Sequence, residues 1–192
     1  MKRDIIICGV GGQGILSLSA LIVLAAREES LFVQQSEIHG MAQRGGDVVA
    51  QLRLSDQPIH SGLIPHGEVD LILSMEPLEA MRYVKQMAPD GMVLASSDPV
   101  RNIPGYPEDW EVRFHRLPRA HLIPAARLAK QAGSPLSSNV VMVGAATPYL
   151  PLSPQSLERA VAAVFARKGE AVVEINLRAL ALGLEAVQCV PR

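Results

Sequence analysis

The chain has few of the residues with which proteins hold metal clusters or contact nucleic acid. Its two cysteines, Cys8 and Cys189, do not form a C-x-x-C pair, so the sequence by itself supplies no zinc or iron–sulfur site. Aromatic residues make up 4 %, too few for stacking along a single nucleic-acid strand. The formal net charge of −1 provides no overall field to hold a phosphate backbone or an anionic membrane. We therefore expect no metal on this chain and no binding to nucleic acid or membranes.

The sequence also lacks a clear targeting or membrane-spanning segment. Residues 5–26 are uncharged, but four glycines and one glutamine separate their apolar runs, 5–8 and 15–26. A membrane helix needs about 20 continuous apolar residues. Asp4 is also atypical of the cationic start of a secretory signal. Since there is no disulfide framework either, we expect a cytoplasmic protein.

The apolar content is sufficient for one folded domain, which we expect to span residues 1–192. Apolar residues make up 48 % and charged residues 19 %, as in a globular protein. Apolar runs of strand length alternate with helical stretches, which indicates an α/β fold, a Rossmann-like three-layer sandwich with a mostly parallel sheet. The strand with Gln51 and Arg53 on one face is expected to expose that face to solvent and to lie at a sheet edge. The predicted strands cover residues 5–8, 31–34, 48–54, 69–74, 92–95 and 112–117.

Several helix starts carry capping signals. Glu76 and Ser153 each precede a proline, which is typical of an N-cap followed by proline at the first helical position. Ser138 and Asn139 are the predicted cap of a third helix over residues 140–146. The Ala- and Leu-rich C-terminal third is predicted to form a helical cover on the sheet. Within it, residues 171–175 are either a strand or the start of a final helix.

A glycine-rich loop joins the first strand to the first helix. Gly9, Gly11 and Gly14 fit G-x-G-x-x-G in the strand–loop–helix context that the motif requires. Backbone amides and the positive end of a helix suit a phosphate or carboxylate there. A nicotinamide or flavin site would add an acid at the tip of the second strand, where the sequence has Gln35 and no acid before Glu37. The loop predicts anion binding; the alternative is a close strand–helix crossing without a ligand.

The helix expected over residues 15–26 is polar only at Ser17 and Ser19. A helix on one face of a sheet should expose a polar stripe, so this one needs a second cover. Either the C-terminal helices or another subunit would supply it.

Residues 36–46, SEIHGMAQRGG, combine three glycines with Glu, His, Gln and Arg between two strands. Arg44 could bind a carboxylate or phosphate through two hydrogen bonds, and His39 could titrate near neutral pH. The alternative is a glycine-rich turn whose charged groups pair only with one another.

Four strings of the sequence resemble one known family. GVGGQGI, SEIHGMAQRGGDVVAQLR, SMEPLEAMRYV and SSNVVMVGA are similar to the gamma-type subunit or domain of 2-oxoacid:ferredoxin oxidoreductases, and most closely to the beta subunit of the indolepyruvate branch. The likeness covers most of residues 4–185. GMAQRGG is more specific than the glycine loop, and it favours the arylpyruvate branch over pyruvate- and 2-oxoglutarate-type relatives, which remain the alternative.

The resemblance implies an accessory subunit, inactive alone. The complex would decarboxylate an arylpyruvate on thiamine diphosphate, pass electrons through iron–sulfur clusters to ferredoxin, and transfer the acyl group to coenzyme A. Thiamine diphosphate and the clusters would belong to a large partner subunit, so this chain would hold no cofactor by itself. It would complete the active-site region and contact coenzyme A.

The resemblance also places the family's patterns on particular residues. We hypothesise that the amides of residues 11–14 bind an anionic group and that Arg44 faces the same cleft or the partner's cofactor. Arg44 and His39 are the candidate catalytic groups. The matching positions are Gly9, Gly11, Gly12, Gln13, Gly14, Glu37, His39, Gly40, Met41, Gln43, Arg44, Gly45 and Gly46.

Two other classes of protein remain as alternatives. An ATP-dependent adenylating enzyme also carries GxGGxG, but it would add an acid at the second strand tip and often paired C-x-x-C ligands. A non-catalytic ligand sensor or assembly module would keep the α/β fold and bind its ligand alone.

Overall fold

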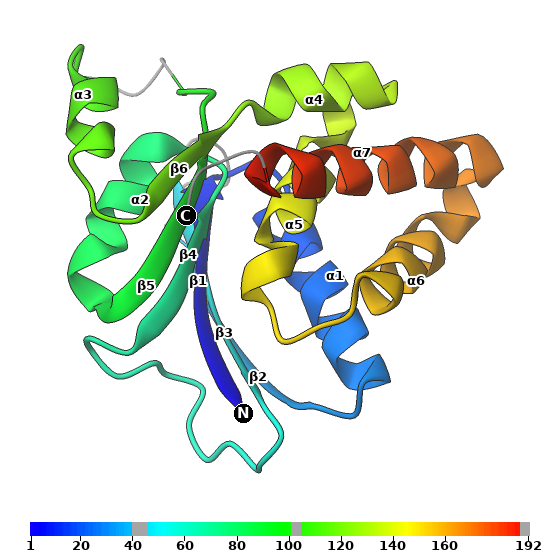
Figure 1. The fold of residues 1–192 in the computed structure, drawn as a ribbon, viewed down its shortest axis with the longest axis horizontal. Coiled ribbons are helices and arrows are strands. Elements are labelled where there is room, and N and C mark those ends of the chain that lie inside the picture. The colour runs from blue at the N-terminus through cyan, green and yellow to red at the C-terminus, as the bar shows by residue number, and fades with distance from the viewer. Residues whose placement is uncertain (40–45, 101–104, 189–192) are drawn as a thin grey trace.

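A computed structural model describes residues 1–39, 46–100 and 105–188, and it contains one six-stranded sheet in the order β2-β3-β1-β4-β5-β6 (Figure 1). Strands β1, β4, β5 and β6 pair in parallel, whereas β3 is antiparallel to both β1 and β2. The predicted α/β fold with a mostly parallel sheet is confirmed. The strands are β1 Lys2–Val10, β2 Phe32–His39, β3 Asp47–Ser55, β4 Val69–Ser74, β5 Met87–Ser96 and β6 Ala120–Ile123.

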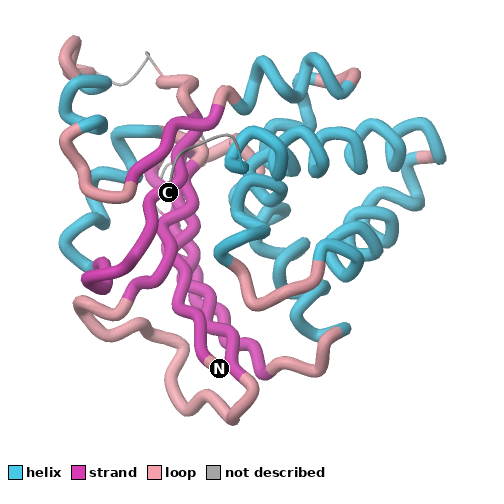
Figure 2. Tube along the Cα trace, in the orientation of Figure 1, coloured by secondary structure: helices cyan, strands magenta, loops and turns pink. Residues whose placement is uncertain are grey.

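Helices cover both faces of the sheet. Helices α1 and α4 to α7 lie on one face, and the shorter α2 and α3 lie on the other (Figures 1 and 2). The helices are α1 Ile15–Glu28, α2 Pro77–Tyr83, α3 Trp110–His115, α4 Ala125–Ala132, α5 Ser138–Ala146, α6 Pro154–Phe165 and α7 Glu170–Gln188. Among the described helices, none is both long and apolar enough to cross a membrane.

Strand β1 is buried on both faces, which explains its unbroken apolar run. Ile5 and Ile7 pack into the large cluster beneath α1, whereas Ile6 and Cys8 pack into the smaller cluster beneath α2 and α3. A strand covered by helices on both sides needs apolar residues at every position.

Two of the three predicted helix caps are confirmed. The Glu76 carboxylate accepts a hydrogen bond from the Glu79 amide at 2.9 Å, and the Ser153 hydroxyl accepts one from the Ser156 amide at 3.2 Å. The third helix exists, but its N-cap is Ser137 and the cap residue makes no side-chain hydrogen bond.

One strand prediction in the second half of the chain was wrong. Residues 112–117 fall in α3 and the turn after it, because Phe114 and Leu117, three apart, both face the cluster beneath α3. The sixth strand is β6 instead, a four-residue strand that pairs with β5. Residues 171–175 belong to α7, which settles the alternative left open there.

The expectation that β3 is a wet edge strand was also wrong. It lies between β2 and β1, and the loop after it covers its polar face. Arg53 donates to both carboxylate oxygens of Asp4, at 2.8 and 3.2 Å, and to the carbonyl oxygens of Ser61 and Leu63. Asp4 is fully buried. Arg53 therefore joins a buried carboxylate on β1 to the loop that follows β3.

Helices α5 and α7 cross at backbone contact. A Cβ added at Gly183 would lie 1.9 Å from the carbonyl oxygen of Val141, and one at Gly144 would lie 2.0 Å from that of Leu180. The crossing therefore admits no side chain at either glycine, and it fixes α5 against the longest helix.

Of the two proposed covers of α1, the C-terminal helices supply part. Helices α5 and α6 pack against it, and Ser19 is fully buried. Leu16 and Leu24 nevertheless remain 43 % and 40 % exposed, with exposed Ala20 between them. The C-terminal helices cover one side of α1 and leave an apolar stripe open.

Replacing Arg53 with Met should lower the free energy of unfolding by about 3 kcal/mol, because it leaves the buried Asp4 carboxylate without its main partner. Chemical denaturation measures the change. As a matched control, Arg113→Met removes only an exposed pair and should leave stability unchanged. Equal effects of the two variants would contradict the role given to the buried pair.

Gly183→Ala should destabilise the protein by about 3 kcal/mol, because the added methyl group must push α5 and α7 apart. Gly62→Ala is the control, since the nearest atom to its added Cβ lies at 3.9 Å. It should change the unfolding free energy by less than about 0.5 kcal/mol.

Candidate functional site

The candidate site lies between two neighbouring strands, β1 and β4, whose following helices lie on opposite faces of the sheet. The chain leaves β1 for α1 on one face and leaves the neighbouring strand β4 for α2 on the other. A crevice outside the carboxyl ends of such strands is the usual ligand site of open α/β sheets. The glycine loop and the residues after β4 meet at this position.

The glycine loop has the geometry of an anion site. Gly12 and Gly14 have φ angles of 103° and 77°, in the left-handed region that favours glycine. Gly14 is the N-cap of α1, without a side-chain cap and without an acidic residue in the first turn. Apart from its chain neighbours, no atom of the described residues lies within 4 Å of the Cβ position at Gly12, so the described part of the chain leaves that side of the loop open. The positive end of α1 therefore has no carboxylate of its own helix to neutralise it.

Gln13 holds the loop in place. Its Oε1 accepts from the amide of Val10 at 2.7 Å, and its Nε2 donates to the carbonyl of Met75 at 3.1 Å. Both polar ends of the side chain thus bind backbone, and they join the glycine loop to the end of β4. A ligand contact for Gln13 stays a prediction.

The structure brings the end of the second glycine-rich stretch to the first. The amide of Gly11 donates to the carbonyl of Gly46 at 2.8 Å, and Val10 is paired with Asp47. The amide of Gly11 is therefore engaged by the chain itself. The predicted site residues Gly40, Met41, Gln43, Arg44 and Gly45, and the side chain of His39, lie outside the described residues.

The sheet order places the tip of β2 too far from the glycine loop for the acidic residue of a dinucleotide site. Glu37 lies exposed near the end of β2, where the Gln35 side chain donates to it. Strand β3 separates β2 from β1, so the tip of β2 lies two strand spacings, about 10 Å, from the glycine loop. An acid there is one strand further away than in a dinucleotide fold, where the second strand adjoins the first.

Asn139 is a site residue that the sequence reasoning took only for a helix cap. It lies in the first turn of α5 and is 9 % exposed. Its Nδ2 atom lies 2.9 Å from the Cβ position at Gly14, so the starts of α1 and α5 adjoin there. An amide donor and two helix N-termini thus converge beside the loop. No local spacing signals this pair, because 125 positions separate the two residues along the chain.

Glu76 connects the crevice to the loop after β5. One oxygen of its fully buried carboxylate accepts from the Tyr106 hydroxyl at 2.6 Å and from the Val100 amide at 3.3 Å. The other caps α2. The sequence identified only the capping role, because the loop partners lie 24 and 30 positions away.

Two further buried groups lie near the crevice, Cys8 on β1 and Glu79 on α2. Burial raises the pKa of the Cys8 thiol to about 12, so the thiol stays protonated at neutral pH. Burial also raises the pKa of Glu79, which pairs with Arg82 at 3.1 Å through one oxygen. The other oxygen has no hydrogen-bond partner among the described residues. Among the described residues, no group of three or more His, Cys, Asp or Glu could hold a metal ion.

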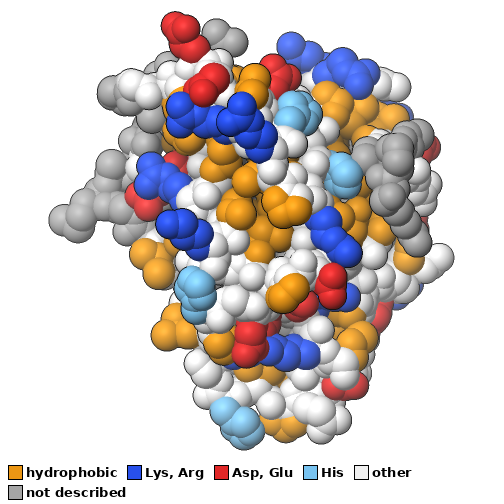
Figure 3. Space-filling view, turned by 60° about the vertical axis from the view of Figure 1, so that its left-hand side comes forward, with side chains coloured by type: hydrophobic (Ala, Val, Ile, Leu, Met, Phe, Trp, Pro, Cys, Tyr) orange, Lys and Arg blue, Asp and Glu red, His pale blue; other side chains and the backbone are white. Residues whose placement is uncertain are grey.

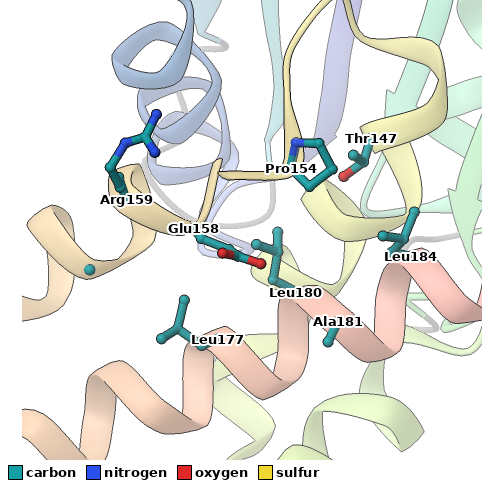
Figure 4. A pocket seen from close by; sticks show the side chains of 9 residues that line it. Thr147, Pro154, Glu158, Arg159, Leu177, Leu180, Ala181 and Leu184 are labelled. Atoms are coloured by element: carbon teal, nitrogen blue, oxygen red, sulfur yellow. The ribbon is translucent and has the colours of Figure 1, made fainter. Parts of the chain in front are cut away.

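A separate pocket of about 520 Å³ opens between α6 and α7 (Figure 4). Its walls are mostly apolar, and Glu158 points into it, whereas Arg159 points away and pairs with Glu28. It lies at the opposite end of α5 from Asn139, since Thr147 follows that helix. None of the described residues expected at the site lines it, and its one inward charge does not suit an anion.

On the surface, charges of both signs are mixed. The face in Figure 3 shows Lys and Arg next to Asp and Glu, with hydrophobic side chains between them. The hydrogen-bond donors of the crevice are a local feature, which the net charge of −1 does not reveal.

The fold defines a Rossmann-like domain with a glycine-rich loop at its switch point. Sequence comparison gives the family: the profile of the pyruvate ferredoxin/flavodoxin oxidoreductase family matches residues 4–186, and the chain belongs to that family. The indolepyruvate oxidoreductase subunit IorB of Methanothermobacter thermautotrophicus is 38 % identical over 97 % of this chain and 98 % of its own length.

Two solved structures share the fold. A keto/oxoacid ferredoxin oxidoreductase gamma subunit from Geobacter sulfurreducens has a TM-score of 0.71 and 25 % identity, over 98 % of this chain and 97 % of its own. The 2-oxoglutarate:ferredoxin oxidoreductase of Magnetococcus marinus, solved with 2-oxoglutarate, coenzyme A and succinyl-CoA, has a TM-score of 0.80 and 22 % identity, over 99 % of this chain and 32 % of its own. The resemblance stated from the four sequence strings is thus confirmed at the level of the family.

Gly14→Ala should destabilise the protein by about 1–2 kcal/mol, because alanine is strained at this left-handed position. The added methyl group also meets the Asn139 amide. The double variant Gly14→Ala with Asn139→Ala should therefore lose less stability than the sum of the two single variants, as denaturation titrations would show. Strict additivity would contradict the contact.

Proposed function

We propose that this chain is the accessory, gamma-type subunit of a 2-oxoacid:ferredoxin oxidoreductase of the indolepyruvate branch. Such a complex oxidatively decarboxylates the 2-oxoacid to an acyl-CoA and passes the electrons to ferredoxin. The observation that carries the proposal is the 38 % identity to an indolepyruvate oxidoreductase subunit along nearly the whole of both chains. Family membership favours this reading over an adenylating enzyme.

We further propose that thiamine diphosphate and the iron–sulfur clusters belong to a large partner subunit. The cysteine content supports this division, because a cluster requires several cysteine thiolates and the chain has two cysteines that form no C-x-x-C pair. The open stripe of Leu16, Ala20 and Leu24 on α1 supports a second subunit as part of its cover.

The chain's own part is to bind an anionic group at the crevice. The carbonyl of Gly46 engages the amide of Gly11, and the carbonyl of Val10 engages the amide of Gln13. The donors are therefore the amides of Gly12 and Gly14, the first turn of α1 and Nδ2 of Asn139. A phosphate of coenzyme A, or the carboxylate of an oxoacid, fits this set in charge. Arg44 would face the same cleft and add a bidentate contact.

In the reconstituted complex, Arg44→Ala should raise the KM for coenzyme A or for the oxoacid by about tenfold, the loss expected for a charged hydrogen bond. Ferredoxin reduction, with each substrate varied in turn, is the assay. Arg113→Ala on α3, across the sheet, is the matched control and should leave both KM values unchanged. Unchanged kinetics of Arg44→Ala toward both substrates would remove this residue from the site.

The same assay decides between the branches of the family. The proposal predicts the highest kcat/KM for indolepyruvate in a panel that includes pyruvate and 2-oxoglutarate. A preference for either of the other two acids would assign the chain to a pyruvate- or 2-oxoglutarate-type complex instead.

A further inference from the structure

Strand β2 is an end strand of the sheet with an unusually open outer edge. Within the described ranges, β3 is its one pairing partner, and the strand runs for eight residues. Phe32 and Ile38, near its two ends, are 48 % and 55 % exposed. Natural edge strands are usually protected by Lys, Pro, a bulge or shortness, and FVQQSEIH has neither Lys nor Pro. An edge of this kind pairs readily with another strand.

The exposed apolar side chains lie on one face of β2. Because side chains alternate along a strand, Phe32, Gln34, Ser36 and Ile38 share a face, opposite to Val33, which packs toward the cluster beneath α1. Helix α2 packs against β1, β4 and β5, so it does not reach this end of the sheet. The loop after β3 crosses this face near Ser36, where a Cβ added at Gly62 would lie 3.9 Å from the Ser36 Cβ. Phe32 and Ile38, on either side of Ser36 along the strand, nevertheless stay about half exposed.

We propose that two copies of this chain pair edge to edge through β2, antiparallel, with Gln35 on a two-fold axis perpendicular to the sheet. In this register Phe32 of each copy lies opposite Ile38 of the other, Gln34 lies opposite Ser36, and Gln35 lies opposite itself. An aromatic residue opposite a β-branched one is a favourable cross-strand pair, and here it occurs twice.

The strand is self-complementary in charge as well as in apolar contacts. Its one charged residue, Glu37, falls opposite Val33, so the two carboxylates do not face each other. A slip of two residues in either direction separates both Phe32–Ile38 pairs. Self-complementarity is what an isologous two-fold contact requires, and it favours a second copy over a strand of unrelated sequence. The small contact should give a dimer that dissociates in the micromolar range.

Cysteine cross-linking tests the register directly, in the full-length chain with Cys189→Ser. Directly opposed Cα atoms in an antiparallel pair lie about 4.5–5.5 Å apart, within the range of a disulfide. Gln35→Cys should therefore give a disulfide-linked dimer on mild oxidation. Gln34→Cys alone should not, but a mixture of the Gln34→Cys and Ser36→Cys variants should cross-link. Efficient cross-linking by Gln34→Cys alone, or none by Gln35→Cys, would overturn the register.

Sedimentation velocity over a micromolar concentration series tests the dimer itself. The wild-type chain should dimerise, Phe32→Glu should shift it to monomer, and Leu136→Glu, at an 88 % exposed position outside β2, should not. Circular dichroism establishes that each variant is folded. A monomer at all concentrations, or a dimer that survives Phe32→Glu, would overturn the proposal, as would a partner's strand found on β2. The result is independent of the proposed function, because no enzymatic activity is measured.

Discussion

The turn from β1 into α1 is the constraint on which the site depends. It requires glycine for two different reasons: at Gly9 an added Cβ would lie 2.7 Å from the Ile15 side chain, and at Gly14 the backbone is left-handed. The Gln13 side chain joins the turn to the end of β4, and the carbonyl of Gly46 accepts a hydrogen bond from the amide of Gly11. Three segments far apart in sequence, the turn itself, Gly46 and the end of β4, are thereby held together.

The helical layer completes the same construction. The crossing at Gly144 and Gly183 fixes α5 against α7, and the start of α5 places Asn139 beside Gly14. On the other side of the sheet, Glu76 joins α2 to the loop after β5. The crevice is thus built by backbone contacts and buried polar groups, which define positions more strictly than exposed side chains do.

Local patterns in the sequence predicted the elements with strong local signals. The buried run of β1, the glycine loop and the proline-marked starts of α2 and α6 were read correctly, because each depends on neighbouring residues. The four-residue strand β6 and the short helix α3 were missed, since neither is long enough to show a period. The contacts of Asn139 with Gly14 and of Tyr106 with Glu76 join distant residues, so no spacing along the chain could reveal them.

The central claim is that this polypeptide supplies anion-binding backbone to an oxidoreductase whose reactive cofactors lie on another subunit. The most direct measurement is purification of the tagged chain from its native host, with iron, thiamine diphosphate and protein content determined in the same sample. The account predicts that a larger subunit copurifies and that iron and thiamine diphosphate follow that subunit when the two are separated. Recovery of the chain alone, or of both cofactors with the separated small chain, would contradict it.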